Sequence, residues 1–175
     1  MANKTKSSAR VIYTGSATTE SQLILNGQAW NAGSFLRTDT AGFLVLCATG
    51  SDIATGGVTH MALTTVTDPG NTTTQAKVLR LAADTIFESS VHHDTDTSAL
   101  APQSIIGQKY GLDVSTNGLL VVSTVDLEET TEANYFWQVI DVASEYDPAD
   151  NTVSDQYGFV RCKILTVVLD ATLAA

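Results

Sequence analysis

The stretch IGQKYGLDVSTNGLLVVST, residues 105–123, decides the expected fold of this chain. Two runs rich in apolar and β-branched residues flank the pair Asn117-Gly118. Asn-Gly readily takes the positive φ angles that a tight hairpin turn requires. The stretch therefore predicts a strand, a turn and a second strand that pairs with the first. Its spacing serves the fold and carries no recognisable chemistry.

The last apolar segment, within residues 159–171, shows the clearest alternation. Val160, Cys162 and Ile164 fall on one face of an extended chain, and Arg161 and Lys163 fall on the other. This period of two is typical of a half-buried strand.

Similar short segments, separated by turn residues, run through the rest of the chain. In residues 75–89 the first half favours a strand, although periodicity leaves a short helix open. Residues 89–102 are expected to form a surface loop or linker, and residues 145–158 a long turn-rich loop. Further strands or hairpins are expected at residues 11–15, 21–30, 33–50, 56–66 and 134–143.

These segments together predict an all-β fold. We expect a compact antiparallel β-barrel or sandwich, with a mobile N-terminal arm and at most one or two short helices. Residues 1–10 are expected to be a flexible basic arm, and residues 11–175 a single β-rich domain.

The charge is strongly acidic and unevenly placed. The chain has 9 basic and 19 acidic residues, and Lys4, Lys6 and Arg10 supply three of the basic ones before the first acid, Glu20. An acidic body repels DNA and anionic membranes, so we expect no direct nucleic-acid or membrane partner. The basic start is either a solvated end or an arm that reaches an acidic surface.

The cysteines and the termini indicate a protein made in a cytoplasm. Cys47 and Cys162 both lie in apolar, strand-like runs, so two buried free thiols are expected, with a disulfide as the alternative. The sequence shows no signal peptide and no apolar run long enough to span a membrane. We therefore expect a soluble chain.

A search for chemistry finds no convincing catalytic, metal or cofactor site. His92, His93, Asp94 and Asp96 offer metal-ligand atoms, but adjacent histidines on a strand point apart, and an exposed polar loop explains them better. His60 lies in a strand and is expected to be structural rather than a general base. Acidic clusters read as solvated surface, and phosphate-binding loops and nucleophile elbows are absent. The prediction is a protein that is not an enzyme and needs no cofactor.

Three stretches, taken together, resemble the capsid decoration, or cement, proteins of tailed double-stranded-DNA bacteriophages. They are GSFLRTDTAGFLVLCATGSDIATGGVTHMAL (33–63), IGQKYGLDVSTNGLLVVST (105–123) and NYFWQVIDVASEYDPADNTVSDQYGFVRCKIL (134–165). The resemblance is one of pattern and composition, without an invariant motif. It implies a structural virion protein, made in the host cytoplasm, that binds the outside of an assembled capsid and bridges neighbouring major capsid subunits.

The resemblance also implies partners and sites. Many such proteins are homotrimers with an N-terminal arm on the capsid. Lys4, Lys6 and Arg10 are therefore the hypothetical capsid-binding residues. The aromatic residues Trp30, Tyr135 and Trp137 are the hypothetical oligomer interface, although core packing explains them about as well.

Other function classes stay open at this point. One is another phage structural protein, such as a head-fibre base, a minor capsid protein or a tail component. Another is a carbohydrate-binding β-module, against which the absence of a signal peptide argues.

Overall fold

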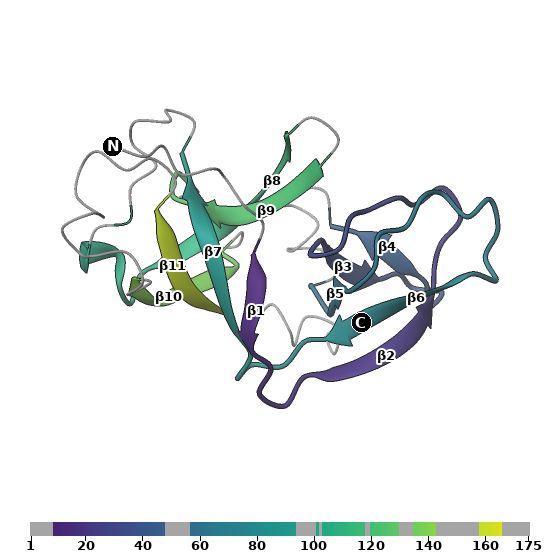
Figure 1. The fold of residues 1–175 in the computed structure, drawn as a ribbon, viewed down its shortest axis with the longest axis horizontal. Coiled ribbons are helices and arrows are strands. Elements are labelled where there is room, and N and C mark those ends of the chain that lie inside the picture. Colours follow the sequence, from purple (N-terminus) through teal and green to yellow (C-terminus); the bar gives the residue numbers. More distant parts are fainter. Residues whose placement is uncertain are drawn as a thin grey trace.

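The computed structural model describes residues 9–47, 57–93, 101, 103–117, 120–129, 135–142 and 158–165. Within these ranges the fold is all-β, as predicted (Figure 1). The strands are β1 (Arg10–Tyr13), β2 (Thr18–Leu23), β3 (Phe35–Thr38), β4 (Leu44–Leu46), β5 (His60–Ala62), β6 (Gln75–Arg80), β7 (Ile86–His92), β8 (Lys109–Asn117), β9 (Leu120–Asp126), β10 (Trp137–Val142) and β11 (Phe159–Ile164). One 3-10 turn, η2 (Gln103–Ile105), precedes β8.

Five strands close into a barrel. The order is β7-β11-β10-β8-β9, and β9 returns to pair with β7 in parallel through Val91–Val125 and His92–Asp126. All other pairings among the described strands are antiparallel. Strand β1 pairs with the first part of β7, on the edge opposite β11, whereas β9 pairs with the end of β7.

The remaining five strands form a second sheet in the order β2-β6-β5-β3-β4. This sheet curls until its two ends meet, because Ile24, just after β2, forms a parallel bridge with Leu44 of β4. The amide of Leu25 also donates to the carbonyl of Leu44 at 3.1 Å. The two lobes lie next to each other in Figure 1.

A two-stranded ribbon runs through both lobes. In the second sheet β2 pairs with β6, and in the barrel β1 pairs with β7. Arg10 lies opposite Glu88 and Leu23 lies opposite Gln75, with equal numbers of residues between these pairs on each strand. The ribbon bends between the two sheets, at residues 14–17 and 81–85, and this bend sets the position of one lobe against the other.

The two lobes share one core. Phe35 of β3 packs edge to face against Phe87, Phe136 and Trp137 of the barrel lobe, with ring centroids 5.1–5.7 Å apart. Met61 and Leu79, from the same face of the second sheet, join this cluster. The opposite face of the sheet lines a smaller core inside the curl, made of Ile24, Trp30, Leu36, Leu44, Ala62, Ala76 and Val78. Alternate residues of the second sheet therefore serve two separate cores.

Several sequence predictions are confirmed. The hairpin within residues 105–123 is β8–β9, closed by the pair Asn117–Leu120. The hairpin within residues 33–50 is β3–β4, and its turn is held by Asp39, whose carboxylate accepts from the amides of Ala41 and Phe43. Residues 75–80 form a strand rather than a helix.

The burial of the final strand and of both thiols also agrees with the sequence. In β11, Val160, Cys162 and Ile164 are buried, while Arg161 and Lys163 are partly exposed. Cys47 and Cys162 are free, buried thiols. No helix in the described part of the chain is long and apolar enough to cross a membrane.

The prediction of a surface loop at residues 89–102 is wrong for its first residues. Strand β7 continues to His92, and Ser89 and Ser90 are fully buried. Both serines pair with β11, through Val160–Ser89 and Phe159–Ser90. Small polar side chains are typical of loops in a sequence. Here, however, the backbone of Ser89 and Ser90 pairs with β11 and so belongs to the barrel. Residues 94–100 and 102 lie outside the described ranges.

Candidate functional site

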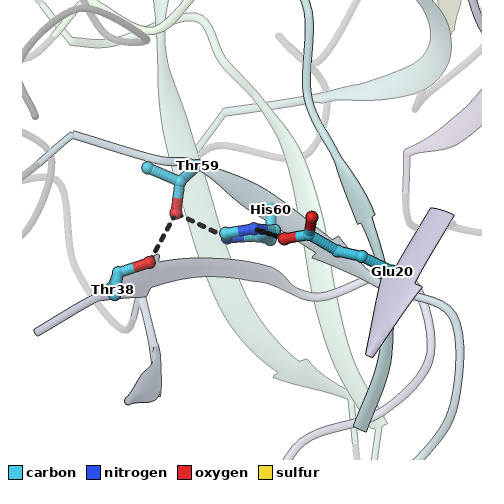
Figure 2. Close-up of polar contacts among 4 residues, drawn as sticks. All are labelled: Glu20, Thr38, Thr59 and His60. Atoms are coloured by element: carbon cyan, nitrogen blue, oxygen red, sulfur yellow. Dashed lines mark hydrogen bonds and ion pairs between the residues drawn. The ribbon is translucent and has the colours of Figure 1, made fainter. Parts of the chain in front are cut away.

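A chain of polar side chains surrounds the buried His60. The Nε2 atom of His60 lies 2.7 Å from Oε1 of Glu20, and Nδ1 lies 2.7 Å from Oγ1 of Thr59 (Figure 2). The Thr59 hydroxyl is in turn 3.3 Å from that of Thr38. The residues come from β2, the start of β5 and β3, so three segments far apart in sequence converge on one ring.

The curl of the second sheet brings these groups together. Strand β6 lies between β2 and β5, yet the contact between Glu20 and His60 passes over it. His60 is 4% exposed, and its burial lowers its pKa. Glu20 opposes this shift through its hydrogen bond and its charge, while the charge of Arg80 acts with burial.

The arrangement suits a structural histidine, as expected from the sequence. Both ring nitrogens are already bonded, and the Thr59 hydroxyl is shared with Thr38. A nucleophile needs open space for a substrate beside its hydroxyl, and none of these four residues lines the groove described next.

The second feature is an apolar groove of about 610 Å³ between the lobes. Strand β1 forms one wall, and the second sheet forms the other. The lining residues are Ala9, Arg10, Val11, Thr14, Thr19, Ala32, Gly33, Met61, Ala62, Leu63 and Leu79. No sequence motif indicated this groove, because its walls come from five separate segments.

The groove adjoins a strand edge. Among the described strands β1 has β7 on one side and no neighbour on the other. Ile12 and Tyr13 of β1 are 42% and 57% exposed, and Leu63 on the groove is 36% exposed. Backbone donors and acceptors at such an edge, next to an apolar groove, suit an added extended segment.

The structure changes the role of one predicted capsid-binding residue. Arg10 begins β1 and is not part of a free arm. Its Nε donates to Oε1 of Glu88 at 2.9 Å, and its Nη2 forms an ion pair with the same oxygen. The Glu88 side chain is 5% exposed, so Arg10 neutralises a buried carboxylate. Lys4 and Lys6 lie outside the described residues.

The three residues of the predicted oligomer interface lie in different surroundings in the structure. Trp137 is 0% exposed and Trp30 is 3% exposed within a single chain, which leaves neither indole a surface for a second copy. They are core residues, because one side of β10 faces the shared core and Trp30 caps the smaller core. Tyr135 is half-buried. Burial, followed by the charge of Tyr135, raises the pKa of its neighbour Tyr110.

The possible metal ligands are not gathered in the part of the chain that the structure describes. No group of three or more His, Cys, Asp or Glu side chains there has metal-binding geometry. His92 ends β7, and His93 lies 3.4 Å from a carboxylate oxygen of Glu128. Asp94 and Asp96 fall outside the described residues.

No protein-family model, curated protein or solved structure matches this chain.

Proposed function

We propose that this chain is a structural protein of a tailed double-stranded-DNA phage virion. It binds the outside of an assembled capsid after synthesis in the host cytoplasm, and it stabilises the shell by bridging neighbouring major capsid subunits. The bound form is a homotrimer. The observation that carries the proposal is the apolar groove beside the edge of β1 that has no neighbour among the described strands.

The groove is apolar surface that neither core of the described residues fills. The shared core and the smaller core already bury the large aromatic and aliphatic side chains. Even so, Leu63, Ile12 and Tyr13 stay exposed around one strand edge. Exposed apolar surface beside an open edge is unfavourable unless a partner covers it.

The partner that fits is an extended apolar segment of the capsid subunit. The edge of β1 that lacks a neighbour among the described strands supplies main-chain hydrogen bonds, and the groove takes alternate side chains of the added strand. Lys4 and Lys6 precede Ala9 at the groove and remain candidates for ion pairs with an acidic capsid surface. Binding to the assembled shell alone stabilises the shell by mass action, and many repeated contacts add through multivalency.

A pair of leucines tests this assignment. Leu63 lines the groove and is 36% exposed, whereas Leu23 on β2 is 37% exposed and lies outside it. We expect Leu63→Asp to weaken binding to shells depleted of the native protein at least tenfold, because a carboxylate in an apolar interface must be desolvated. Leu23→Asp should bind as the unchanged protein does.

The readout is co-sedimentation of each purified variant with the shells over a range of concentrations. Equal binding by both variants would contradict the role of the groove. If the unchanged protein shows no binding to any shell, the proposed function itself fails.

A further inference from the structure

The hydrogen bonds around His60 have a direction that the Glu20 carboxylate sets. An ionised carboxylate only accepts, so Nε2 of His60 must carry the proton that it donates to Glu20. In the neutral ring Nδ1 then accepts, and the Thr59 hydroxyl must donate to it. Oγ1 of Thr59 in turn accepts from the hydroxyl of Thr38. One orientation of the whole chain therefore belongs to the neutral ring.

Protonation of the ring reverses this chain without breaking it. A proton taken from solvent at Nδ1 turns that atom into a donor, and Oγ1 of Thr59 becomes its acceptor. The Thr59 hydroxyl then rotates to donate to Thr38, whose own hydroxyl proton turns away. The same atoms at the same distances serve both states, which a hydroxyl allows and an amide does not.

We propose that the chain Glu20–His60–Thr59–Thr38 is a proton-reversible latch that holds the curl of the second sheet. Its hydrogen bonds survive protonation, but the charged ring is then buried, at 4% exposure for His60, and this cost loosens the second sheet before the barrel. The latch joins β2, β5 and β3 over the intervening β6. It lies on the inner face of the curl, because His60 pairs with Leu36 and shares its face with Ala62, both members of the smaller core. The inference does not depend on the proposed function.

The charges around the ring decide which state is preferred. Glu20 on β2 favours the imidazolium, and Arg80, opposite His60 on β6, disfavours it. On β3, His60 lies opposite the uncharged Leu36 and is linked through Thr59 to the uncharged Thr38. Burial is the largest effect and also disfavours the charged ring.

The direction of the pH effect follows from this balance. The pKa of His60 is lower in the folded chain than the ordinary value of 6.5. The unfolded chain therefore binds the proton first as the pH falls, and the stability contributed by neutral His60 is complete above about pH 6.5. That contribution is lost as the pH falls from there through the lower pKa of the folded state.

The tautomer provides the first test. Long-range proton–nitrogen NMR spectra of the whole protein at about pH 7.5 should show His60 protonated at Nε2 and unprotonated at Nδ1. On acidification, Nδ1 should become protonated at a lower pH than in an unfolded control. A neutral ring protonated at Nδ1, or a midpoint at or above that of the control, would overturn the proposal.

Hydrogen exchange provides the second test. The amides of Thr59 and Leu81 bond within the second sheet, and those of Val91 and Phe136 bond within the barrel lobe. Between about pH 7.5 and 5, protection at Thr59 and Leu81 should fall about tenfold for each unit of difference between the folded and unfolded pKa. Protection at Val91 and Phe136 should change far less.

Two variants separate the latch from general acid sensitivity. His60→Gln should remove the acid-induced loss of protection that is confined to the second sheet. His92→Gln, at the end of β7, should retain this loss. Equal loss in both lobes, or an unchanged loss in His60→Gln, would contradict the proposal. The tautomer measurement on the unchanged protein decides the matter if His60→Gln does not fold.

Discussion

At the scale of single residues, Gly15 occupies a position at the ribbon's bend that a larger residue cannot take without moving a neighbour. Its φ angle is 54°, and an added Cβ would lie within 2.7 Å of the carboxyl carbon and both carboxylate oxygens of Asp84. Asp84 accepts from the amide of Ser16 at 2.9 Å and from its hydroxyl at 2.8 Å. These bonds lower the pKa of Asp84, so its carboxylate stays ionised as an acceptor.

We therefore expect Gly15→Ala to lower the free energy of unfolding by more than the positive φ angle alone would. A residue other than glycine at positive φ costs roughly 1–2 kcal/mol. At Gly15 the displaced Asp84 also loses its bonds to Ser16, which adds to this cost. Gly27→Ala is the matched control, because its φ is 82° and nothing lies within 4 Å of an added Cβ. Urea unfolding should show the larger loss for Gly15→Ala, and equal losses would contradict this account.

At the scale of elements, a ladder of alternating charges crosses the outside of the barrel lobe. Glu88 of β7 lies opposite Arg10 of β1 on one side and Arg161 of β11 on the other. Arg161 in turn pairs with Asp141 of β10, with Nη1 and Oδ2 3.6 Å apart. The ladder explains how the short strand β1 is held on the barrel lobe. Arg10 of β1 neutralises Glu88, which is the buried residue of the ladder.

Removal of Arg10 should therefore weaken the whole fold. Arg10→Ala leaves a buried carboxylate without its closest partner, and we expect the free energy of unfolding to fall by about 1–3 kcal/mol. Adding Glu88→Gln should recover part of the loss, because the remaining group is uncharged. Asp141→Ala is the control from the exposed end of the ladder, and its cost should be about 0–1 kcal/mol. Chemical denaturation of the unchanged protein, Arg10→Ala, the double variant and Asp141→Ala checks this order of stabilities. An Arg10→Ala protein as stable as the unchanged one would refute it.

Local patterns predicted the elements well where turn chemistry and alternation were both present. The hairpin β3–β4 follows from the turn at Asp39, and the burial of β11 follows from the alternation in FVRCKIL. The β8–β9 hairpin was predicted from its two strands, but Asn117, expected in the turn, pairs with Leu120 as the last residue of β8. The continuation of β7 through Ser89 and Ser90 could not be predicted, because their burial depends on β11, about 70 residues later in the chain.

The candidate sites were less predictable than the strands. The sequence predicted a structural His60 because it lies in a strand without a catalytic motif, but its partner Glu20 lies 40 residues away and across an intervening strand. Arg10 belongs to a basic run in the sequence, and only the register of β1 shows that it neutralises Glu88. The groove joins side chains from five segments, so no local pattern indicated it.

At the scale of the whole molecule, the shared aromatic core should make the two lobes unfold together. Trp30 reports on the smaller core and Trp137 on the shared one. In Trp137→Phe and in Trp30→Phe, the remaining indole's fluorescence and the far-ultraviolet circular dichroism should give coincident urea transitions near neutral pH. A separate, earlier transition for either indole would show that the lobes are independent units.

The same core should be sensitive to a single substitution at its centre. Phe35 touches Phe87, Phe136 and Trp137, and it is 1% exposed. Phe35→Ala should lower the free energy of unfolding by about 3–5 kcal/mol, because it leaves a cavity between the lobes. A loss confined to the second sheet, measured by hydrogen exchange, would contradict a shared core.

The proposed function is tested most directly by sedimentation of the native source. A nuclease-treated lysate is separated on a density gradient, and this chain is quantified in each fraction. The account predicts that it travels with nuclease-resistant particles in hundreds of copies per particle, as a protein that covers a shell must. Recovery only as a small free oligomer at the top of the gradient would contradict it.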